Sequence, residues 1–452
     1  MSLDDNFEIF FQNLLPDNME DINNTVAAIG RKLSRTYYGD NKHDTSSTEN
    51  GLDHMWVVGS VGRKTAVKGI SDLDVIFDIP EDLYRRFDSY EGNGQSALLQ
   101  NIKETLLEKY PRTTIRGDGQ VVDIVFDKYT IEVVPGLQQA DGSFLYPDTH
   151  DGGSWQVTDP LTEQRECENC NARSSGLYYD LCRSLRAWKN EQGFVFRGIL
   201  IDSLVYNFLV HYLESGFSNR ACRDCLSVFR SLFDFLRLQN PSTNNWRTVG
   251  TQQPIENDDD EFLEQANEAF EKLGEIDDAT SGNANAILAE VFGGDFSDGD
   301  HRAERANYFH SPAQRRLWNG SGSSEEFIDQ LVPVDIRYRV TIDCRVEQNG
   351  FRPFMLREFL KDGKGMWLQH HKKLEFSIST DCPKPYDTWW KVRNVGREAE
   401  RRNMIRGTIL KTNEMKHWEH TDFYGPHYVE CYLIRNGICV AKNRIDVPIG
   451  EE

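Results

Sequence analysis

Apolar side chains recur every three to four residues near the start of the chain and through its middle third. That spacing places them along one face of a helix. It predicts helices within residues 5–37, as a covering layer, and a separate helical lobe over residues 161–296. Within this lobe the pattern is present in residues 177–191, 198–214, 227–238, 258–273 and 284–292.

Short runs of apolar and β-branched residues, bounded by turn residues, lie between the first helices and the helical lobe. This composition indicates strands, with a helical pattern over residues 96–110 among them. The predicted strands occupy residues 55–58, 73–79, 114–117, 120–126 and 130–135. We therefore predict an α+β fold in which residues 1–160 form a mixed sheet flanked by helices.

The last part of the chain has a different character. Residues 297–331 are rich in Gly, Ser, Asp, Asn and Arg, which predicts a linker. After the linker, Asn436-Gly437 separates two apolar runs, a strong signal for a β-hairpin. Strand composition is found in residues 332–345, 375–379, 428–435 and 438–442. Residues 332–452 are thus predicted to form a second, β-rich domain.

The chain is acidic, with a formal net charge of -21. This sign argues against a protein that simply coats DNA or RNA, because such proteins bind phosphates through a basic surface. Residues 331–452 are nevertheless net basic. The longest apolar stretch, residues 198–210, is shorter than the about 20 residues of a transmembrane helix. Residues 1–8 carry acidic rather than basic groups, so we expect a cytoplasmic protein with no membrane partner.

Nine cysteines in a chain of this kind favour free thiols or metal binding over a disulfide framework. Cys167-x-x-Cys170 and Cys222-x-x-Cys225 have the composition of a four-cysteine zinc site. Both pairs lie in or beside helical segments, where buried thiols are ordinary small apolar residues. We therefore favour buried thiols and do not include zinc among the predicted cofactors, and the sequence leaves zinc binding by these pairs open.

A glycine-serine turn and two acidic residues carry the clearest chemical signal. Gly59-Ser60 precedes a basic segment that includes Arg63 and Lys64, and Asp72-Leu73-Asp74 then opens a strand. Residues two apart on a strand point to the same face. Asp72 and Asp74 can therefore bind divalent cations together, while the turn and the basic side chains receive nucleotide phosphates. This combination predicts phosphoryl-transfer chemistry with two Mg²⁺ ions, or Mn²⁺ in their place.

A third carboxylate is expected to complete the metal site. Glu132 is the best candidate because it is a lone charge in an otherwise apolar predicted strand. Asp123 is the alternative. A DxD pair alone is a weak signal, since an edge strand can carry two solvated acids, but the turn and the third acid strengthen it.

With these motifs the sequence resembles the bacterial cyclic-oligonucleotide synthases (CD-NTases), relatives of cyclic GMP-AMP synthase and oligoadenylate synthase. The resemblance extends over nearly the whole chain, and its last part is similar to the AGS-C sensor domain of that family. It implies a polymerase-β-like nucleotidyltransferase fold. The matching residues include Gly59-Ser60, Asp72-x-Asp74, Glu132-Val133-Val134-Pro135, Gly152-Gly153-Ser154-Trp155, Ala187-Trp188-Lys189-Asn190, Trp390-Lys391-Val392-Arg393 and Tyr424-Gly425-Pro426-His427.

The resemblance implies roles for individual residues. Asp72, Asp74 and Glu132 would be metal ligands, and Ser60 would contact the triphosphate. The family commonly has Asp at the third position, so Glu132 implies altered geometry rather than lost activity. Lys189 and Ser203 would contact phosphates from the helical lobe. A solvated helix charge and a helix-packing hydroxyl are the respective alternatives.

Two aromatic features carry a further binding hypothesis. Trp155 could stack on a nucleobase, although a packed indole is equally compatible with the sequence. The C-terminal domain interleaves aromatic and basic residues, which predicts a nucleotide or nucleic-acid ligand there, with a solvated basic face as the alternative. This cluster comprises Trp389, Trp390, Lys391, Arg393, Arg397, Arg401, Arg402 and Arg406.

The leading hypothesis is an enzyme that joins ATP and other nucleoside triphosphates into a cyclic di- or trinucleotide. The resemblance implies bacterial anti-phage signalling, in which a separate effector reads the diffusible product. One alternative is transfer of a nucleotide to a protein or RNA end by the same metal site. Another is a catalytically silent nucleotide sensor, but clustered, mutually repelling carboxylates have no purpose in such a protein.

Overall fold

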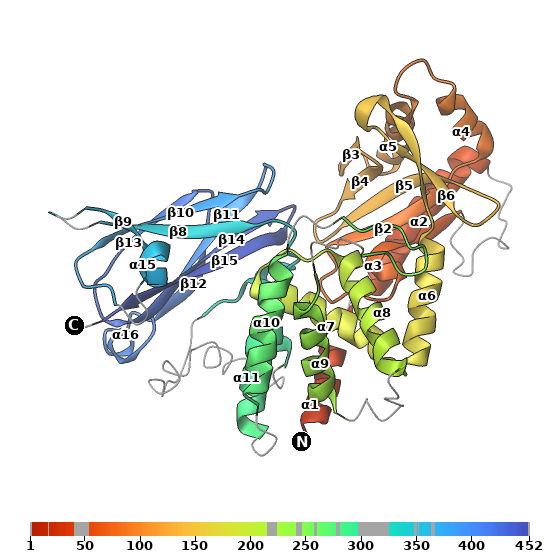
Figure 1. Cartoon of the computed structure of the whole chain (residues 1–452). Coiled ribbons are helices and arrows are strands. Elements are labelled where there is room, and N and C mark those ends of the chain that lie inside the picture. Colours follow the sequence, from red (N-terminus) through yellow and green to blue (C-terminus); the bar gives the residue numbers. More distant parts are fainter. Residues whose placement is uncertain are drawn as a thin grey trace.

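The structure is a computed structural model of the 452-residue chain, and Figure 1 shows its arrangement. A mixed sheet with its helices, a helical lobe and a C-terminal β-rich domain lie side by side. Separate hydrophobic clusters lie in each of these parts. The structure describes residues 2–16, 18–39, 54–214, 224–240, 246–256, 260–276, 281–296, 325–347, 350, 352–362 and 367–450.

The first part is built on a mixed sheet, as predicted, and this sheet has seven strands, of which β6 and β7 were not predicted. Its central path runs β1-β2-β5-β4-β3, and β6 and β7 extend from β5. Strands β2 and β5 are parallel, and the other pairs are antiparallel. The strands are β1 (Met55–Val57), β2 (Asp72–Asp78), β3 (Thr114–Asp118), β4 (Val121–Val125), β5 (Thr130–Gln138), β6 (Phe144–Asp148) and β7 (Ser154–Thr158).

Helices α2 (Met19–Tyr38) and α5 (Gly94–Lys109) pack with this sheet, and α4 (Glu81–Asp88) packs against α5. Helix α2 buries Ile22, Val26, Ile29 and Leu33, which lie on one face because they are three or four residues apart. The same spacing predicted the helix. The apolar face of α2 therefore joins the core of the sheet.

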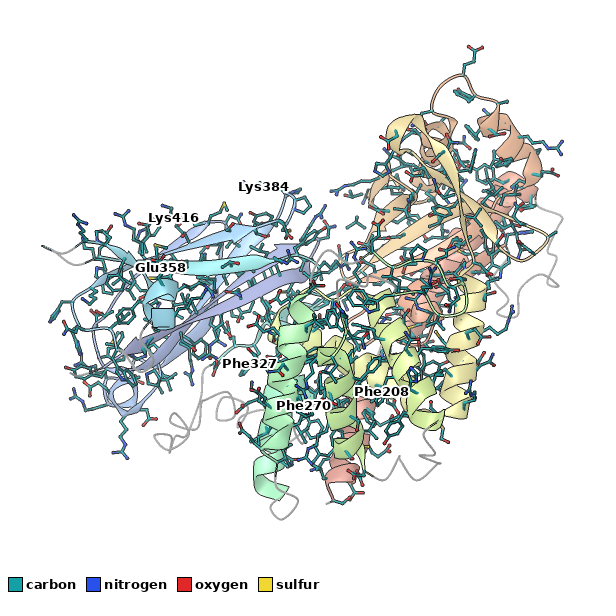
Figure 2. The ribbon with its side chains drawn as sticks, in the orientation of Figure 1. Phe208, Phe270, Phe327, Glu358, Lys384 and Lys416 are labelled. Carbon is teal, nitrogen blue, oxygen red and sulfur yellow. The ribbon has the colours of Figure 1, made fainter. Side chains whose placement is uncertain are left out.

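Helix α1 (Leu3–Asn13) belongs to a different core. Its Phe7 and Phe10 are fully buried among helices of the helical lobe rather than in the core of the sheet. Figure 2 shows Phe208 and Phe270 among the side chains that fill the space between these helices. The lobe comprises α6 (Pro160–Arg173), α7 (Leu177–Gln192), α8 (Gly198–Glu214), α9 (Cys225–Arg237), α10 (Glu261–Gly274), α11 (Ser281–Phe292) and the short η4 (Gly294–Phe296).

The cysteines of the predicted zinc motifs pack as apolar residues where the structure describes them. Cys167, Cys170 and Cys225 carry thiols that are buried in the core of the helical lobe. Burial raises the pKa of both Cys167 and Cys170 to about 12, which disfavours the thiolate that binds metal. Cys222 lies outside the described residues.

The C-terminal domain is formed by two four-stranded sheets whose side chains share one core. The predicted hairpin is present, with Asn436 and Gly437 both at positive φ between β14 and β15. One sheet has the order β13-β10-β8-β9 and the other β12-β11-β14-β15. The elements are α14 (Ile328–Leu331), β8 (Val340–Glu347), β9 (Phe354–Met355), α15 (Leu356–Asp362), β10 (Lys373–Thr380), β11 (Asp387–Arg393), α16 (Arg397–Arg401), β12 (Arg406–Thr412), β13 (Lys416–His420), β14 (Gly425–Arg435) and β15 (Ile438–Ile449).

One predicted strand is only partly present. Strand composition extends over residues 332–345, yet β8 begins at Val340. The preceding residues run beside the start of β15, where Asp335 and Arg337 donate backbone hydrogen bonds to Cys439 and Val440. Their side chains point toward the first two parts of the molecule instead of joining a sheet.

No helix within the described ranges combines the length and the apolar composition that crossing a membrane requires.

Candidate active site

A cavity of about 550 Å³ lies where the mixed sheet, the helical lobe and the start of the C-terminal domain meet. Ser60, Asp72 and Asp74 line it from the sheet side, and Lys189 lines it from α7. Residues Val334 to Arg337 close another wall. The structure therefore brings together residues that the sequence placed about 130 and 260 positions apart.

Strand register aligns the acidic residues. Asp72 and Asp74 occupy alternate positions at the start of β2, and both are partly exposed. Asp74 is paired with Glu132 of β5, and Glu132 with Asp123 of β4. Three acidic side chains thus lie side by side across three neighbouring strands. Glu132 contacts Asp74 and does not itself line the cavity.

The side chains of Asp74 and Glu132 lie within hydrogen-bonding reach of each other, so one proton can bridge the two carboxyl groups. Burial raises the pKa of both carboxyl groups, and repulsion from Asp74 and Asp123 contributes at Glu132. The pKa of Glu132 rises to about 8. Two carboxylates held this close cannot both be ionised near neutral pH unless a cation replaces the proton.

The donors at this site are carboxylate oxygens, the ligands that Mg²⁺ and Mn²⁺ prefer. In the described part of the chain no group of three or more His, Cys, Asp or Glu side chains is arranged around a metal position. Here Asp72 forms an ion pair with Arg337, while the raised pKa of Glu132 favours a proton between Glu132 and Asp74. The carboxylates are of the chemical type that binds a divalent cation. For a cation to bind, the ion pair between Asp72 and Arg337 would have to break, and the proton between Asp74 and Glu132 would have to leave.

The raised pKa of Glu132 predicts a pH-dependent metal affinity. A cation binds the ionised pair, so the proton must leave, and Mn²⁺ affinity should rise by about tenfold per pH unit below pH 8 and level off above it. Titration of Mn²⁺ by electron paramagnetic resonance from pH 6 to pH 9 measures this. Glu132→Gln should flatten the profile, and an equally steep profile in this variant would contradict the assignment.

The glycine of the Gly59-Ser60 turn is required by the acidic residue beside it. Gly59 begins the single-turn helix α3 (Gly59–Gly62) at φ +63°, and a Cβ there would lie 1.8 Å from Oδ2 of Asp74. The backbone of Val58 also donates a hydrogen bond of 2.8 Å to the carbonyl of Asp74. The turn therefore fixes where the Asp74 carboxylate can lie.

Gly59→Ala should consequently displace Asp74 and lower catalytic turnover by about a hundredfold, because misplacing a catalytic group by about 1 Å can have that effect. Gly142→Ala is the matched control, since Gly142 also has a positive φ but no atom within 4 Å of its Cβ position. Steady-state rates of the two variants are compared. Both substitutions introduce backbone strain, but only Gly59→Ala also introduces the contact with Asp74. Equal rates would show that the contact with Asp74 has no effect on catalysis.

The two basic residues after the turn have partners within the chain. Arg63 is buried, and its guanidinium donates to Asp202 at 2.9 Å and forms an ion pair with Glu163 at 3.3 Å. It lines the cavity, but its charge is already balanced. Lys64 is exposed, pairs with Glu168 at 3.0 Å and does not line the cavity.

Of the three other residues predicted to contact the nucleotide, one lines the cavity and two do not. Lys189 lines the cavity, and its ammonium group donates to Asp335 at 3.0 Å. Ser203 is buried in α8 and does not line the cavity. Trp155 also lies away from the cavity lining, where its indole donates to Asp88 at 3.0 Å and packs against Tyr84.

Sequence reasoning missed the wall of the cavity contributed by residues 334–337. Asp335 and Arg337 belong to the run that was predicted to be a strand, and no motif marks them. Asn190 was part of the quoted helical motif without a role, yet it exchanges hydrogen bonds with the backbone of Val334 and Ile336. The signal in the sequence is weak, because Asp335 and Arg337 are two of five charged residues in the run 332–345.

The basic and aromatic cluster of the C-terminal domain does not form one solvated face. Trp390 and Arg393 are fully buried, and Lys391 is 2% exposed. Glu325 pairs with Lys391 at 2.7 Å and with Arg393 at 3.1 Å. Further along, Arg401 and Arg402 pair with Glu398, and Arg406 pairs with Glu419. The exposed members of this cluster are Arg397, Arg401, Arg402 and Arg406.

Comparison with known families divides the chain in a similar way. Residues 1–171 match the Second Messenger Oligonucleotide or Dinucleotide Synthetase (SMODS) domain. Residues 322–450 match the Adenylyl/Guanylyl and SMODS C-terminal sensor (AGS-C) domain.

Individual relatives agree with these domain matches. A cyclic AMP-AMP-AMP synthase of Acinetobacter sp. (strain ATCC 27244 / 9458) is 24% identical over 262 residues, which cover 54% of this chain and 72% of the relative. A cyclic GMP-AMP synthase of Escherichia albertii is 22% identical over 411 residues, covering 87% and 84%. Among solved structures, E. coli MS115-1 CdnC with ATP is similar at a TM-score of 0.46 and 16% identity, covering 65% of this chain and 98% of that one.

The SMODS match includes the whole mixed sheet, and the AGS-C match includes the two C-terminal sheets. The chain therefore belongs to the bacterial cyclic-oligonucleotide synthase (CD-NTase) family of nucleotidyltransferases and carries a C-terminal AGS-C domain.

Proposed function

We propose that this synthase uses Mg²⁺ or Mn²⁺ to join ATP and other nucleoside triphosphates into a cyclic di- or trinucleotide. The observation that carries the proposal is the alignment of Asp72, Asp74 and Glu132 on β2 and β5, directly beside the Gly59-Ser60 turn. The relatives are named as synthases of cyclic AMP-AMP-AMP and cyclic GMP-AMP, which supports both ring sizes.

Asp72, Asp74 and Glu132 would hold the metal, whose charge stabilises the transferred phosphoryl group and the pyrophosphate when it is bound. A ribose hydroxyl of one nucleotide attacks the α-phosphorus of another. The bond from that phosphorus to pyrophosphate breaks, and the hydroxyl proton is released. The same exchange within the linear product closes the ring.

Residues around the cavity would bind and orient the substrate. Ser60, at the turn, would contact the phosphates, and Lys189 of α7 would supply a cation to them. Arg63 would position the turn through its hydrogen bond to Asp202, in addition to any contact with the phosphates. Approach of the turn and α7 from two parts of the molecule would exclude water from the reacting groups.

Product analysis tests this proposal. The purified chain is incubated with all four labelled nucleoside triphosphates and Mg²⁺, then treated with phosphatase and examined by mass spectrometry. Phosphatase removes terminal phosphates from linear products and leaves rings intact, so a resistant oligonucleotide identifies a cyclic product and its bases. A labelled protein or RNA, or only linear products, would contradict cyclisation.

The biological role we propose is bacterial anti-phage signalling through a separate effector that binds the diffusible product. The two synthase relatives support a signalling product. The name of the matched AGS-C domain supports a nucleotide ligand at the C-terminal domain. Cells that express the chain with a candidate effector should survive phage infection better than cells carrying the Asp74→Asn variant. Equal survival would contradict this role.

A further inference from the structure

Residues 334–337, which we call the latch, connect the C-terminal domain with the candidate active site. On one side, the backbone of the latch is hydrogen-bonded to β15 through Cys439 and Val440. On the other, Asn190 of α7 donates to the carbonyl of Val334 at 2.9 Å and accepts from the backbone N–H of Ile336 at 3.0 Å. The latch therefore cannot leave the cavity wall without breaking contacts to α7.

Arg337 of the latch occupies the position beside Asp72 where a metal cation would bind. Arg337 forms an ion pair with Asp72, the predicted metal ligand that opens β2. The same guanidinium donates to Ser71 at 2.8 Å and to Asp335 at 2.7 Å. Because a carboxylate oxygen cannot accept a guanidinium and coordinate a metal with the same lone pair, Arg337 and a metal ion compete for Asp72.

Asp335 of the latch occupies the position beside Lys189 where a phosphate would bind. Asp335 accepts from the ammonium group of Lys189 at 3.0 Å, and the carbonyl of Ile336 accepts from it at 2.9 Å. Lys189 is buried, so few other partners can reach it. A triphosphate that used Lys189 would have to displace the carboxylate of Asp335.

We propose that the latch is an intramolecular competitor that holds the synthase in a resting state, with Arg337 in place of the metal and Asp335 in place of a phosphate. This inference rests on the proposed function. Substrate and metal bind only the fraction of molecules in which the latch has left, so their apparent affinities are reduced by that fraction. Because the latch is bonded to β15, a movement of the C-terminal domain would withdraw both side chains together.

Simple local electrostatics makes a different prediction, which allows a sharp test. Arg337→Ala removes a positive charge, so without a latch it should weaken binding of an anionic nucleotide. Asp335→Asn removes a negative charge, so without a latch it should weaken binding of a cation. If the latch is a competitor, either variant loosens it, and each should strengthen binding of the ligand that electrostatics alone would disfavour.

The experiment uses the full chain and measures binding rather than turnover. Arg337→Ala should bind a non-hydrolysable ATP analogue, and Asp335→Asn should bind Mn²⁺, about three- to tenfold more tightly than the unmodified chain. Asn190→Ala removes two latch hydrogen bonds without changing charge and should strengthen binding of both ligands. Arg345→Ala, in an exposed pair on β8, is the matched control and should change neither.

The outcomes separate the latch from the proposed function. Weaker binding of the analogue by Arg337→Ala, or unchanged affinities in all three latch variants, would overturn the latch and leave the synthase assignment intact. Absence of Mn²⁺ binding in the unmodified chain and in every variant would contradict the metal site itself, and the latch with it. Circular dichroism of each variant confirms that the fold is retained.

Discussion

Asp74→Asn should lower the rate of nucleotide joining by about a thousandfold or more, since several kcal/mol of charge stabilisation by the metal would be lost. Asp74 lines the cavity and lies against both Gly59 and Glu132, so it is the carboxylate best placed to hold a cation beside the turn. The labelled-nucleotide assay with phosphatase treatment measures the loss. A rate within tenfold of the unmodified chain would exclude Asp74 from the metal site.

Loss of the fold cannot account for this expected result. Burial raises the pKa of Asp74 in the folded chain, so ionising the Asp74 and Glu132 pair opposes folding as the pH rises. A neutral amide removes that repulsion, and the unfolding midpoint of Asp74→Asn at pH 8 should be equal to or higher than that of the unmodified chain. Asp127→Asn, in the exposed turn between β4 and β5, is the control and should retain full activity.

Asp202→Asn should reduce the free energy of unfolding by about 3–5 kcal/mol, the range observed when one partner of a buried ion pair is removed. Asp202 is fully buried in α8 and accepts hydrogen bonds from Arg63, Thr65 and Arg186 at 2.7–3.0 Å. Its loss removes the carboxylate that pairs with the buried Arg186 and leaves the buried Arg63 with Glu163 alone. The network also joins the turn after β1 to α7, so substrate binding should weaken as well.

Denaturation in urea measures the effect, with Glu168→Gln as the control. Glu168 pairs with Lys64 on the surface, and such exposed pairs contribute less than about 1 kcal/mol. Burial alone would raise the pKa of Asp202, but Arg186 and Arg63 outweigh it and hold the pKa below its usual value. The stabilisation by Asp202 is therefore lost as the pH falls through that lowered pKa. A loss no larger than that of Glu168→Gln would contradict this role for the network.

Local patterns in the sequence were sufficient for the elements whose faces are half buried. Helix α2 was predicted because Ile22 and Val26 recur at helical spacing, and the β14–β15 hairpin because Asn436-Gly437 adopts positive φ readily. The Gly59-Ser60 turn and Asp72-x-Asp74 could be recognised because their spacing along the chain sets their chemistry. The sequence did not reveal that Lys391 and Arg393 of β11 are buried, because both pair with Glu325, which is more than 60 positions away in the chain.

The sequence by itself therefore determined the individual helices and strands and the acidic motif, since each depends on neighbours only a few positions away. Tertiary structure alone decided which cations serve the site. In the folded chain Arg63 is hydrogen-bonded to Asp202, Lys189 lines the cavity, and Arg337 forms an ion pair with Asp72. A charged side chain far along the chain carries no local mark of its partner, because an ion pair depends on distance in space and not on separation in sequence.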